Sequence, residues 1–485
     1  MAARVILSKC RCALSASVLA CCTITVLQLG CASEDYILGL QPRSHASAGT
    51  AGAGAGEGGG EGGAAGVVYS ADPILAVQVD VSPGGPNTRL LVGDVTGDGR
   101  RDLVTMQPDS GFDDAHEPHE VVALTAFDLV EGVIWQIGEP DPEAAGSTAD
   151  IPAQIVDIDA DGFNEVVAVM EGMFRAFDGR DGSEKFARDL PDPNAHDAII
   201  IANFSGTPEP QDIVLKDRYD QLWAFDRDWN LLFNYVGPVG HYPWPYDWDE
   251  DGRDELMAGC NYLDDDGTFV WSCAGVLDGV ADAVFTGDLD QDSSNGVEIV
   301  IGGGDTLANG WQGNQHWAYD TVESQNIALG DYRPDLPGLE VAGLDRIVRA
   351  EDGYDGMFLL SAQGDELFFE NREPGSGWST IVQGISHWDE SGRDLIMAYA
   401  RGGGALPTLY DGHFNAVATF PQANAHMMHA DICGDMREEI LVYTPDSMEL
   451  YGTDECDLAA EVTGTPRAQS KRLYNWTRYW GGEYP

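Results

Sequence analysis

Three stretches in the middle of the chain combine residue types that bind anions and transfer protons. Their candidate residues are His196, Lys216, Arg218, Tyr219, His241 and Tyr242. Lysine and arginine total only 26 in 485 residues, so Lys216 and Arg218, two residues apart beside Tyr219, stand out. A cation can hold a carboxylate, and histidine and tyrosine can exchange protons when their pKa values are tuned. The same residues at strand ends are also common packing residues, so their spacing alone does not establish a site.

Eight short Asp-rich segments recur along the chain and predict the elements that position these residues. They start at Asp94, Asp157, Asn203, Asp247, Asp288, Asp331, Asp389 and Asp431. Each lies between two apolar runs, and the starts are roughly 41 to 63 residues apart, which is the period of a propeller blade. Such units bury one another when they stack radially. We therefore predict an all-β chain forming a β-propeller of eight blades, or of seven if the segment at Asn203 is an insertion.

The propeller prediction also places the candidate residues together. Residues just before an inner strand, or at the end of the next strand, lie at one mouth of a propeller. Because the third and fourth blades are neighbours, we expect His196, Arg218, Tyr219, His241 and Tyr242 at one mouth. At the ring's seam, we expect the strand near Pro73–Val81 to pair with Arg472–Trp480, which would remove an open edge.

Three of the Asp-rich segments share the spacing of a calcium loop. Oxygen donors stand at positions 1, 3, 5 and 9, with glycine after the third donor, as a hard cation requires. The donors are Asp94, Thr96, Asp98 and Asp102; Asp157, Asp159, Asp161 and Glu165; and Asp247, Asp249, Asp251 and Glu255. Their flanks have strand periodicity, unlike those of an EF-hand. The loops resemble the calcium loops of FG-GAP/VCBS-type propellers, and we expect them to bind Ca²⁺ in a structural role.

The other loops depart from this pattern by degrees. The fifth keeps its donors with a small insertion, and they are Asp288, Asp290, Asp292 and Glu298. The eighth has Cys433 at position 3, a poor calcium donor, and the seventh is partial. The segments at Asn203 and Asp331 are expected to keep the turn without the ion. Since aspartate and glycine are also ordinary turn residues, a turn without metal is the alternative interpretation throughout.

The first part of the chain is typical of an exported protein. Basic residues precede an apolar stretch, Ala13–Leu29, as in a secretory signal. Residues 27–31 resemble a bacterial lipobox, so residues 1–31 are predicted to be a lipoprotein signal with Cys31 lipidated, and Cys21 is a rival position. Residues 32–68 are rich in glycine and alanine and are predicted to be a flexible linker. Residues 69–485 are predicted to be the propeller of an outer-membrane or cell-surface lipoprotein, secreted if the lipobox is not used.

Cysteine spacing and net charge exclude several classes of function. Five of the nine cysteines lie in the leader, and the rest predict the disulfides Cys260–Cys273 and Cys433–Cys456. No zinc or redox spacing is present. The formal charge of −55 argues against nucleic acid as a partner and for cation binding. We expect a monomer that contacts the membrane only through its lipid.

Longer stretches of the chain resemble a family of enzymes. These are His196–Asp226, Gly240–Gly267, His429–Tyr443 and Tyr474–Trp480. They are similar to the bacterial propeller polysaccharide lyases, above all the eight-bladed family-eleven rhamnogalacturonan lyases and the seven-bladed ulvan lyases. The resemblance covers roughly residues 85 to 485. It implies β-elimination on an acidic polysaccharide that contains uronic acid.

The resemblance also implies roles for the candidate residues. Arg218, helped by Lys216, would hold the uronate carboxylate; His196 or His241 would be the base, and Tyr219 or Tyr242 the acid. Sugar-stacking surfaces would come from Trp244, Trp476 and Trp480. One departure puts activity in doubt: the chain has Val280-Ala281-Asp282 where related sequences often have His-Ala-Asp. The alternative function is therefore a non-catalytic FG-GAP-type propeller that binds glycan or protein at the cell surface.

Overall fold

Short apolar runs separated by turns rich in glycine and aspartate form the strands of this protein. The computed structural model describes residues 72–109, 120–144, 152–277, 281–348, 354–371, 380–389, 391–400, 406–422, 425–444 and 446–459. Within these ranges the regular structure is 32 strands and one 3₁₀ helix, η1 (Ser82–Gly84). The described ranges contain no helix with the length and apolar character needed to span a membrane.

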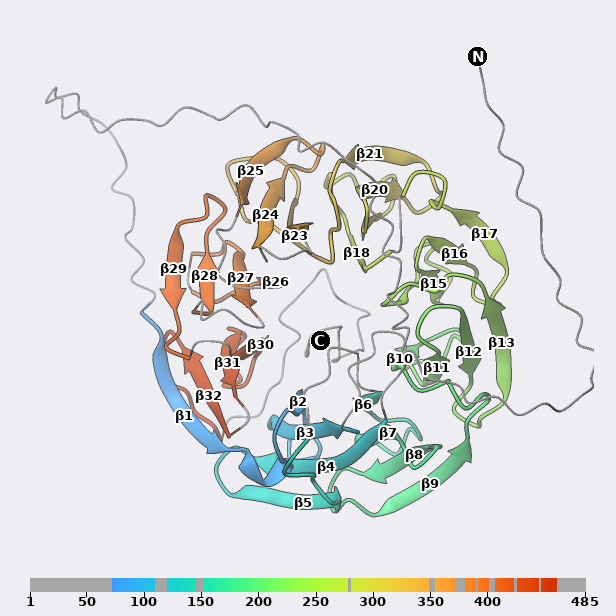
Figure 1. Cartoon of the computed structure of the whole chain (residues 1–485), viewed down its shortest axis with the longest axis vertical. Helices are drawn as coiled ribbons and strands as arrows, with labels where there is room; N and C mark the ends of the chain where they lie inside the picture. The colour runs from blue at the N-terminus through green and yellow to red at the C-terminus, as the bar shows by residue number, and fades with distance from the viewer. Residues whose placement is uncertain are drawn as a thin grey trace, which may run out of the picture. The chain divides into compact units, whose positions relative to one another are not determined.

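The strands form eight antiparallel sheets of four strands, arranged as blades around a ring (Figure 1). Blades one to four are β2 (Arg89–Gly93), β3 (Asp102–Pro108), β4 (Val121–Asp128) and β5 (Gly132–Gly138); β6 (Ala153–Val156), β7 (Glu165–Met170), β8 (Met173–Asp178) and β9 (Glu184–Asp189); β10 (Ala198–Ala202), β11 (Asp212–Lys216), β12 (Gln221–Phe225) and β13 (Leu231–Val236); and β14 (Trp244–Tyr246), β15 (Glu255–Ala258), β16 (Asn261–Leu263) and β17 (Phe269–Ser272).

Blades five to eight are β18 (Ala283–Gly287), β19 (Glu298–Gly302), β20 (Thr306–Gly310) and β21 (Gln315–Tyr319); β22 (Asn326–Gly330), β23 (Glu340–Val348), β24 (Tyr354–Leu360) and β25 (Glu366–Asn371); β26 (Thr380–Ile385), β27 (Leu395–Ala400), β28 (Thr408–Tyr410) and β29 (Ala416–Thr419); and β30 (His426–Ala430), β31 (Glu439–Tyr443), β32 (Ser447–Gly452) and β1 (Ile74–Asp80). In each blade the first strand is innermost and the last is on the rim (Figure 1). The predicted eight-bladed propeller is confirmed.

The first strand of the chain closes the ring as the outer strand of the eighth blade. β1 pairs antiparallel with β32, from Ile74 opposite Gly452 to Asp80 opposite Ser447. The expectation that the strand near Pro73–Val81 closes the ring is met, but its partner is β32. The predicted partner, Arg472–Trp480, lies outside the described residues. Closure gives the eighth blade its fourth strand and joins the start of the propeller to its end.

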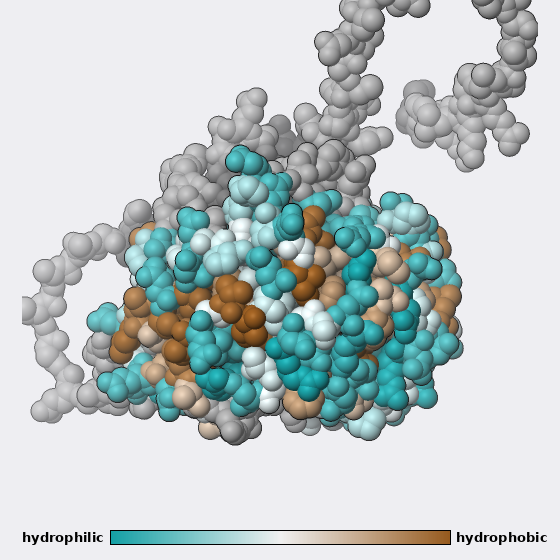
Figure 2. All heavy atoms as spheres, turned by 90° about the horizontal axis from the view of Figure 1, so that it is seen from below, coloured by the Kyte–Doolittle hydropathy of each residue, from teal (hydrophilic) through white to brown (hydrophobic). Residues whose placement is uncertain are grey.

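The inner strands of the blades form the core. Leu90, Leu91 and Val92 of β2 are each at most 1% exposed, and all five residues of β10 are buried. Because neighbouring blades cover both faces of an inner strand, its sequence is a continuous apolar run. The rim differs, since exposed apolar side chains such as Val133 of β5 lie there beside polar ones. Figure 2 shows hydrophobic patches within a mostly hydrophilic surface.

Each Asp-rich segment connects the first and second strands of its blade, and its last acid holds the loop together. In seven blades this carboxylate accepts a hydrogen bond from a backbone N–H near the loop's start. The pairs are Asp102 with Val95, Glu165 with Ile158, Asp212 with Ser205, Glu255 with Trp248, Glu298 with Leu289, Glu340 with Arg333 and Glu439 with Ile432. The late acid therefore has a structural role even in loops whose sequences depart from the metal pattern.

Aromatic side chains on the rim lock neighbouring blades together. Trp271 of β17 donates its indole N–H to the carbonyl of Trp311 at 2.9 Å, and its ring packs on Gly313 of the next blade. Gly313 has φ +88°, and a Cβ there would lie 2.8 Å from the ring of Trp271. Both the backbone conformation and the close contact with the ring therefore require glycine. The ring of Trp317 covers Gly364 in the same way.

Two disulfides, Cys260–Cys273 and Cys433–Cys456, each join two segments of one blade and confirm the predicted pairing.

Candidate functional site

The candidate residues lie at strand ends in three consecutive blades. Asp197 precedes β10, Arg218 follows β11, His241 precedes β14 and Asp282 precedes β18. In a four-stranded antiparallel blade, the start of the first strand and the end of the second lie at the same end. These residues therefore lie at the end of their blades opposite to the Asp-rich loops.

A buried carboxylate in the third blade holds two cations. Asp197 contacts the ammonium of Lys216, and its other oxygen accepts a hydrogen bond from Arg218 Nη1 at 2.8 Å. Lys216 also donates to the carbonyl of Arg218 at 2.9 Å. Asp197, Lys216 and Arg218 are 1%, 0% and 4% exposed. Asp197, Lys216 and Arg218 therefore form one buried cluster of opposite charges in a strongly acidic chain.

Aromatic contacts connect this cluster to the fourth blade. The guanidinium of Arg218 lies 5.6 Å from the ring centre of Tyr219, and that ring meets the imidazole of His241 edge-on at 5.2 Å. The turn before β12 is held by Asp217, whose carboxylate accepts the backbone N–H groups of Tyr219 and Gln221. Tyr219 is half-buried. The guanidinium, phenol and imidazole thus form one continuous set of groups.

His241 is positioned by a second carboxylate and by a close glycine contact. Its Nε2 lies 3.3 Å from Asp282 Oδ1. The preceding Gly240 has φ +68°, and a Cβ there would lie 2.7 Å from Gly259 Cα and 2.8 Å from the carbonyl oxygen of Ala281. Only glycine lets the chain approach the next blade closely enough. A neutral imidazole that donates Nε2–H to Asp282 has its lone pair on Nδ1, and this atom is buried.

The other site residues predicted from the sequence differ in how deeply they are buried. His196 is half-buried and Tyr242 is 6% exposed, both at the same blade end as Arg218. Trp244, expected to stack on sugar, is 3% exposed and packs on Phe285 at 4.9 Å, so its ring belongs to the core. Lys216, expected to help bind the substrate, is enclosed at 0% exposure. Trp476, Trp480 and Val280 lie outside the described residues, as do Cys31, Cys21 and the predicted leader.

Asp197 and Asp282 are the site residues that the sequence prediction missed. Each directly precedes an inner strand, and Asp197 is the neighbour of His196 in the chain. An acidic residue directly before an inner strand could have identified them. Aspartate and glutamate total 81 in this chain, so two more of them did not stand out.

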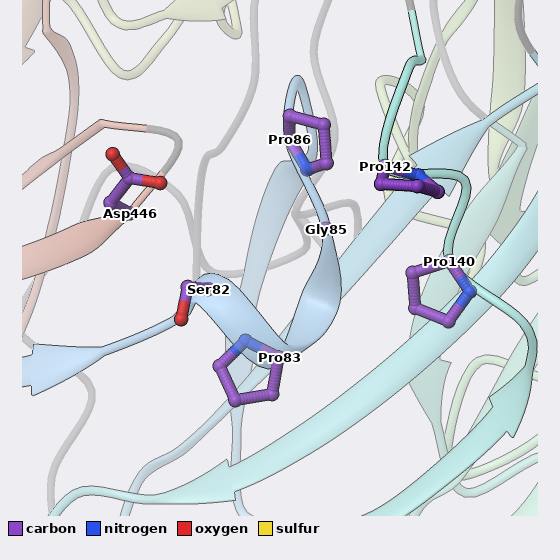
Figure 3. Close-up of a pocket in the computed structure, with 7 residues that line it drawn as sticks. All are labelled: Ser82, Pro83, Gly85, Pro86, Pro140, Pro142 and Asp446. Atoms are coloured by element: carbon purple, nitrogen blue, oxygen red, sulfur yellow. The ribbon is translucent and has the colours of Figure 1, made fainter.

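A cavity of about 440 Å³ at the same end of other blades is distinct from this site (Figure 3). Its lining is Ser82, Pro83, Gly85, Pro86, Pro140, Pro142 and Asp446. These residues connect β1 to β2, β5 to β6 and β31 to β32. The lining offers one carboxylate and no base or cation, so it does not supply the groups that uronate elimination needs.

The Asp-rich loops differ in how far their carboxylates converge. In the fourth loop Asp247, Asp249, Asp251 and Glu255 bring ligand oxygens within 4.8 Å of one another. The second loop does so with Asp157, Asp159 and Glu165. Carboxylate oxygens are the ligands that a hard divalent cation prefers. Burial raises the pKa of Glu255 to about 8, and a bound cation would favour its charged form.

The first and fifth loops have further contacts of their acids. In the first, Arg100 pairs with Asp98, and the carboxylate of Asp102 accepts hydrogen bonds from the backbone N–H and the hydroxyl of Thr96. In the fifth loop, Asp292 accepts hydrogen bonds from Ser294.

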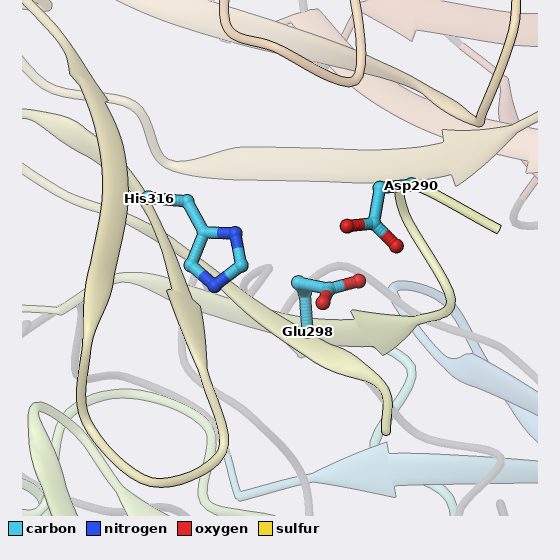
Figure 4. Close-up of side chains that lie close together, drawn as sticks. All are labelled: Asp290, Glu298 and His316. Atoms are coloured by element: carbon cyan, nitrogen blue, oxygen red, sulfur yellow. The ribbon is translucent and has the colours of Figure 1, made fainter. Parts of the chain in front are cut away.

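A histidine from another strand lies with two acids of the fifth loop. His316 of β21 and the carboxylates of Asp290 and Glu298 bring ligand atoms within 4.8 Å of one another (Figure 4). The sequence prediction had no means to find His316, because it lies beyond the loop on another strand.

The comparisons with known proteins agree with the fold and with the resemblance read from the sequence. No family model matches this chain. Rhamnogalacturonan exolyase YesX of Bacillus subtilis (strain 168) is 24% identical over 436 residues, covering 74% of this chain and 69% of that protein. This chain resembles the rhamnogalacturonan lyases, as its sequence predicted. Their solved structures share its propeller fold.

Three solved structures give the extent of that shared fold. The exotype rhamnogalacturonan lyase YesX has a TM-score of 0.61 at 19% identity, covering 78% of this chain and 76% of its own. Rhamnogalacturonan lyase YesW has a TM-score of 0.56 at 20% identity, covering 82% and 74%. The V. cholerae biofilm matrix protein Bap1 has a TM-score of 0.55 at 10% identity, covering 85% and 94%. The fold alone therefore does not separate lyases from matrix proteins.

Proposed function

We propose that this chain is a polysaccharide lyase that cleaves rhamnogalacturonan by β-elimination at its uronic acid residues. The observation that carries the proposal is the continuous set of Arg218, Tyr219 and His241, held by Asp197 and Asp282. The similarity of this chain over 436 residues to a rhamnogalacturonan exolyase also supports the proposal. The set contains a cation, a phenol and an imidazole, which are the three kinds of group that the reaction needs.

In the proposed reaction Arg218 pairs with the uronate carboxylate and so stabilises the charge that develops when C5 loses its proton. His241 takes that proton, and the electron pair of the C5–H bond forms the C4–C5 double bond. The C4–O4 bond breaks at the same time, and O4 receives a proton from a tyrosine. The products are an unsaturated uronate and a new hydroxyl group, with no water consumed.

The contacts favour particular residues for the two proton transfers. His241 is supported as the base because Asp282 lies 3.3 Å from its Nε2, and His196 is the alternative. Tyr219 is supported as the acid because it is half-buried and edge-on to His241. Tyr242, next to His241 in the chain, is the alternative acid. Lys216 acts indirectly, since it shares Asp197 with Arg218.

We also propose a structural Ca²⁺ in the fourth loop, supported by the convergence of Asp247, Asp249, Asp251 and Glu255. The loop lies at the opposite end of its blade from His241. Calcium there would stabilise the folded chain by mass action and would not touch the substrate.

Display of the propeller on the cell surface is a further part of the proposal. It is supported by the lipobox-like sequence that ends at Cys31 and by the linker that follows. A lipid on Cys31 and a glycine-rich tether would hold the enzyme near polymeric substrate while leaving its orientation free.

The second candidate function is a non-catalytic propeller that binds glycan or protein. The observation that favours it is the burial of both cations: Lys216 and Arg218 are 0% and 4% exposed and are already paired with Asp197. A buried, paired arginine is less available to a substrate carboxylate than an exposed one. Bound glycan without cleavage would fit this arrangement.

One experiment separates the two functions. The purified chain is incubated with rhamnogalacturonan, ulvan and other uronans, and the ultraviolet absorbance of the unsaturated uronate is followed. The proposal expects absorbance to rise with rhamnogalacturonan, and to fall to background in folded Arg218→Ala. Glycan binding without any rise across the panel would overturn the lyase and support the binding module.

A further inference from the structure

The second Asp-rich loop contains a cation that belongs to the chain itself. The ammonium of Lys185 lies 2.7 Å from Asp159 Oδ2, 2.8 Å from Asp161 Oδ2 and 2.8 Å from Glu165 Oε1. Two of these three acids, with Asp157, form the group whose oxygens converge as metal ligands would. A lysine has three N–H donors, and here all three have a carboxylate oxygen within hydrogen-bond distance.

Lys185 reaches the loop from a bulge on the outer strand of its blade. Ala176 pairs with Phe186 and Phe177 pairs with Glu184, so Lys185 is the extra residue. A bulge of this kind re-aims a side chain. The same bulge recurs in all eight described blades, and its extra residues in the other seven are Ile134, Leu232, Val270, His316, Leu367, Val417 and Ala76.

Only two of these eight bulge residues have a nitrogen in the side chain, and both side chains lie close to the acids of their own blade's loop. Lys185 contacts Asp159 and Glu165, and His316 gathers with Asp290 and Glu298. Figure 4 shows the imidazole of His316 beside the two carboxylates. The fourth blade has Val270 at this position, which is 53% exposed and has no charge. The bulge residue is therefore the feature that distinguishes loops of nearly identical sequence.

We propose that Lys185 replaces the metal ion in the second loop, and that the same loop becomes a site for one hard divalent cation when Lys185 is changed to valine. A calcium ion lies about 2.3–2.6 Å from its oxygen ligands, so an ion held by Asp159, Asp161 and Glu165 would occupy nearly the position of the ammonium. The two cations exclude each other by overlap and by repulsion. The second loop is thus independent of metal, whereas the fourth is not.

Reciprocal exchanges of the bulge residue test this proposal. Calcium bound per full chain is measured by elemental analysis after dialysis, for wild type, Lys185→Val and Val270→Lys. Lys185→Val is expected to bind about one ion more than wild type, because it frees an all-oxygen site. Val270→Lys is expected to bind about one ion fewer if the fourth loop holds calcium. An unchanged count in Lys185→Val, with the fold retained, would overturn the proposal.

A second variant keeps the test decisive if Lys185→Val does not fold. Asp159→Asn removes one carboxylate from the second loop but leaves the lysine with two partners. The proposal expects its calcium count to equal that of wild type, and the matched change Asp249→Asn in the fourth loop to weaken calcium binding. Loss of one ion in Asp159→Asn would show that the second loop binds metal in the wild type.

Discussion

The two ends of the blades differ in how their charged side chains are paired. At one end a single carboxylate, Asp197, holds two buried cations, Lys216 and Arg218. At the other end, groups of three or four carboxylates converge in the second and fourth loops. We call the first the positive end, after these two cations, and the second the negative end, whose converging carboxylates suit a cation. The formal charge of −55 therefore says little about what either end binds.

The largest expected effect is on activity at the positive end. Arg218→Ala should lower kcat/KM on rhamnogalacturonan by about 10²- to 10³-fold, because it removes the cation that stabilises the developing charge. Asp197 keeps Lys216 as a partner, so the fold should survive. Arg175→Ala, which breaks ion pairs with Glu171 and Glu184 on the second blade, is the matched control and should keep full activity. Equal losses in both variants would mean that arginine removal acts through stability.

Asp282 should matter through His241 and not through contact with substrate. Asp282→Asn is expected to lower kcat by about 10- to 100-fold, the usual cost of losing a partner that orients a histidine, with little change in KM. Because a carboxylate stabilises the protonated imidazole, the acidic limb of the pH–rate profile should move to lower pH. A uniform loss at every pH, without that movement, would assign Asp282 a packing role only.

The positive end should also depend on Asp197 for stability. Asp197→Ala leaves Lys216 and Arg218 buried without their shared partner, and breaking a buried ion pair in this way costs about 3–5 kcal/mol. Urea unfolding monitored by tryptophan fluorescence measures the loss. The exposed carboxylate Asp335, which pairs with Arg333, gives the comparison: Asp335→Ala should cost less than about 1 kcal/mol. Similar costs for both would argue against a tightly coupled cluster.

At the negative end, chelation should lower the melting temperature, and added calcium should restore it. Mass action gives about 2.7 kcal/mol when free calcium is a hundred times Kd, which corresponds to a few °C in a chain of this size. Glu255→Gln should shrink this calcium-dependent shift, whereas Glu165→Gln should leave it unchanged because the ammonium of Lys185 already lies among the acids of the second loop. If Glu165→Gln abolished the calcium-dependent shift of the melting temperature, the second loop and not the fourth would be the one that binds calcium.

The last expected effect is a pH dependence of the metal-free chain. Burial raises the pKa of Glu340 to about 7 and of Glu439 to about 8, from an ordinary value of 4.5. The folded state therefore binds these protons more tightly, and the stability they confer is present below pH 4.5 and is lost as pH rises through about 7 to 8. Urea unfolding in chelator should show lower stability at about pH 9 than at about pH 5, with a smaller fall in Glu340→Gln. Stability that rises over this range would contradict the assignment.

The repeat pattern was enough to predict the fold, because loop and strand signals are local. The eight Asp-rich segments each mark one connection between first and second strands, and the cysteine spacing gave both disulfides. The ring closure was only half predicted. Pairing of β1 with β32 joins residues more than 360 positions apart, and a short outer strand carries no signal that names its partner.

The site was harder to predict because its contacts cross between strands and blades. Lys185 and His316 reach their loops from the outer strand through a bulge, and a one-residue bulge leaves no mark in hydrophobic periodicity. Trp244 has the residue type of a sugar platform but faces the core against Phe285. Residue type and spacing were enough to propose Arg218 and His241 as site residues, whereas their burial and partners required the three-dimensional arrangement.

The most direct test of the central proposal, elimination at the positive end, is the mass of the product made in heavy-oxygen water. Rhamnogalacturonan is incubated with the wild-type chain, and the oligosaccharides are analysed by mass spectrometry. Elimination predicts products that carry an unsaturated uronate, lack one water relative to hydrolysis products, and contain no heavy oxygen from the solvent. The same products should disappear in folded Arg218→Ala. Products that incorporate heavy oxygen would identify a hydrolase, and intact polymer recovered bound to the protein would identify a binding module; either result would contradict the proposed lyase.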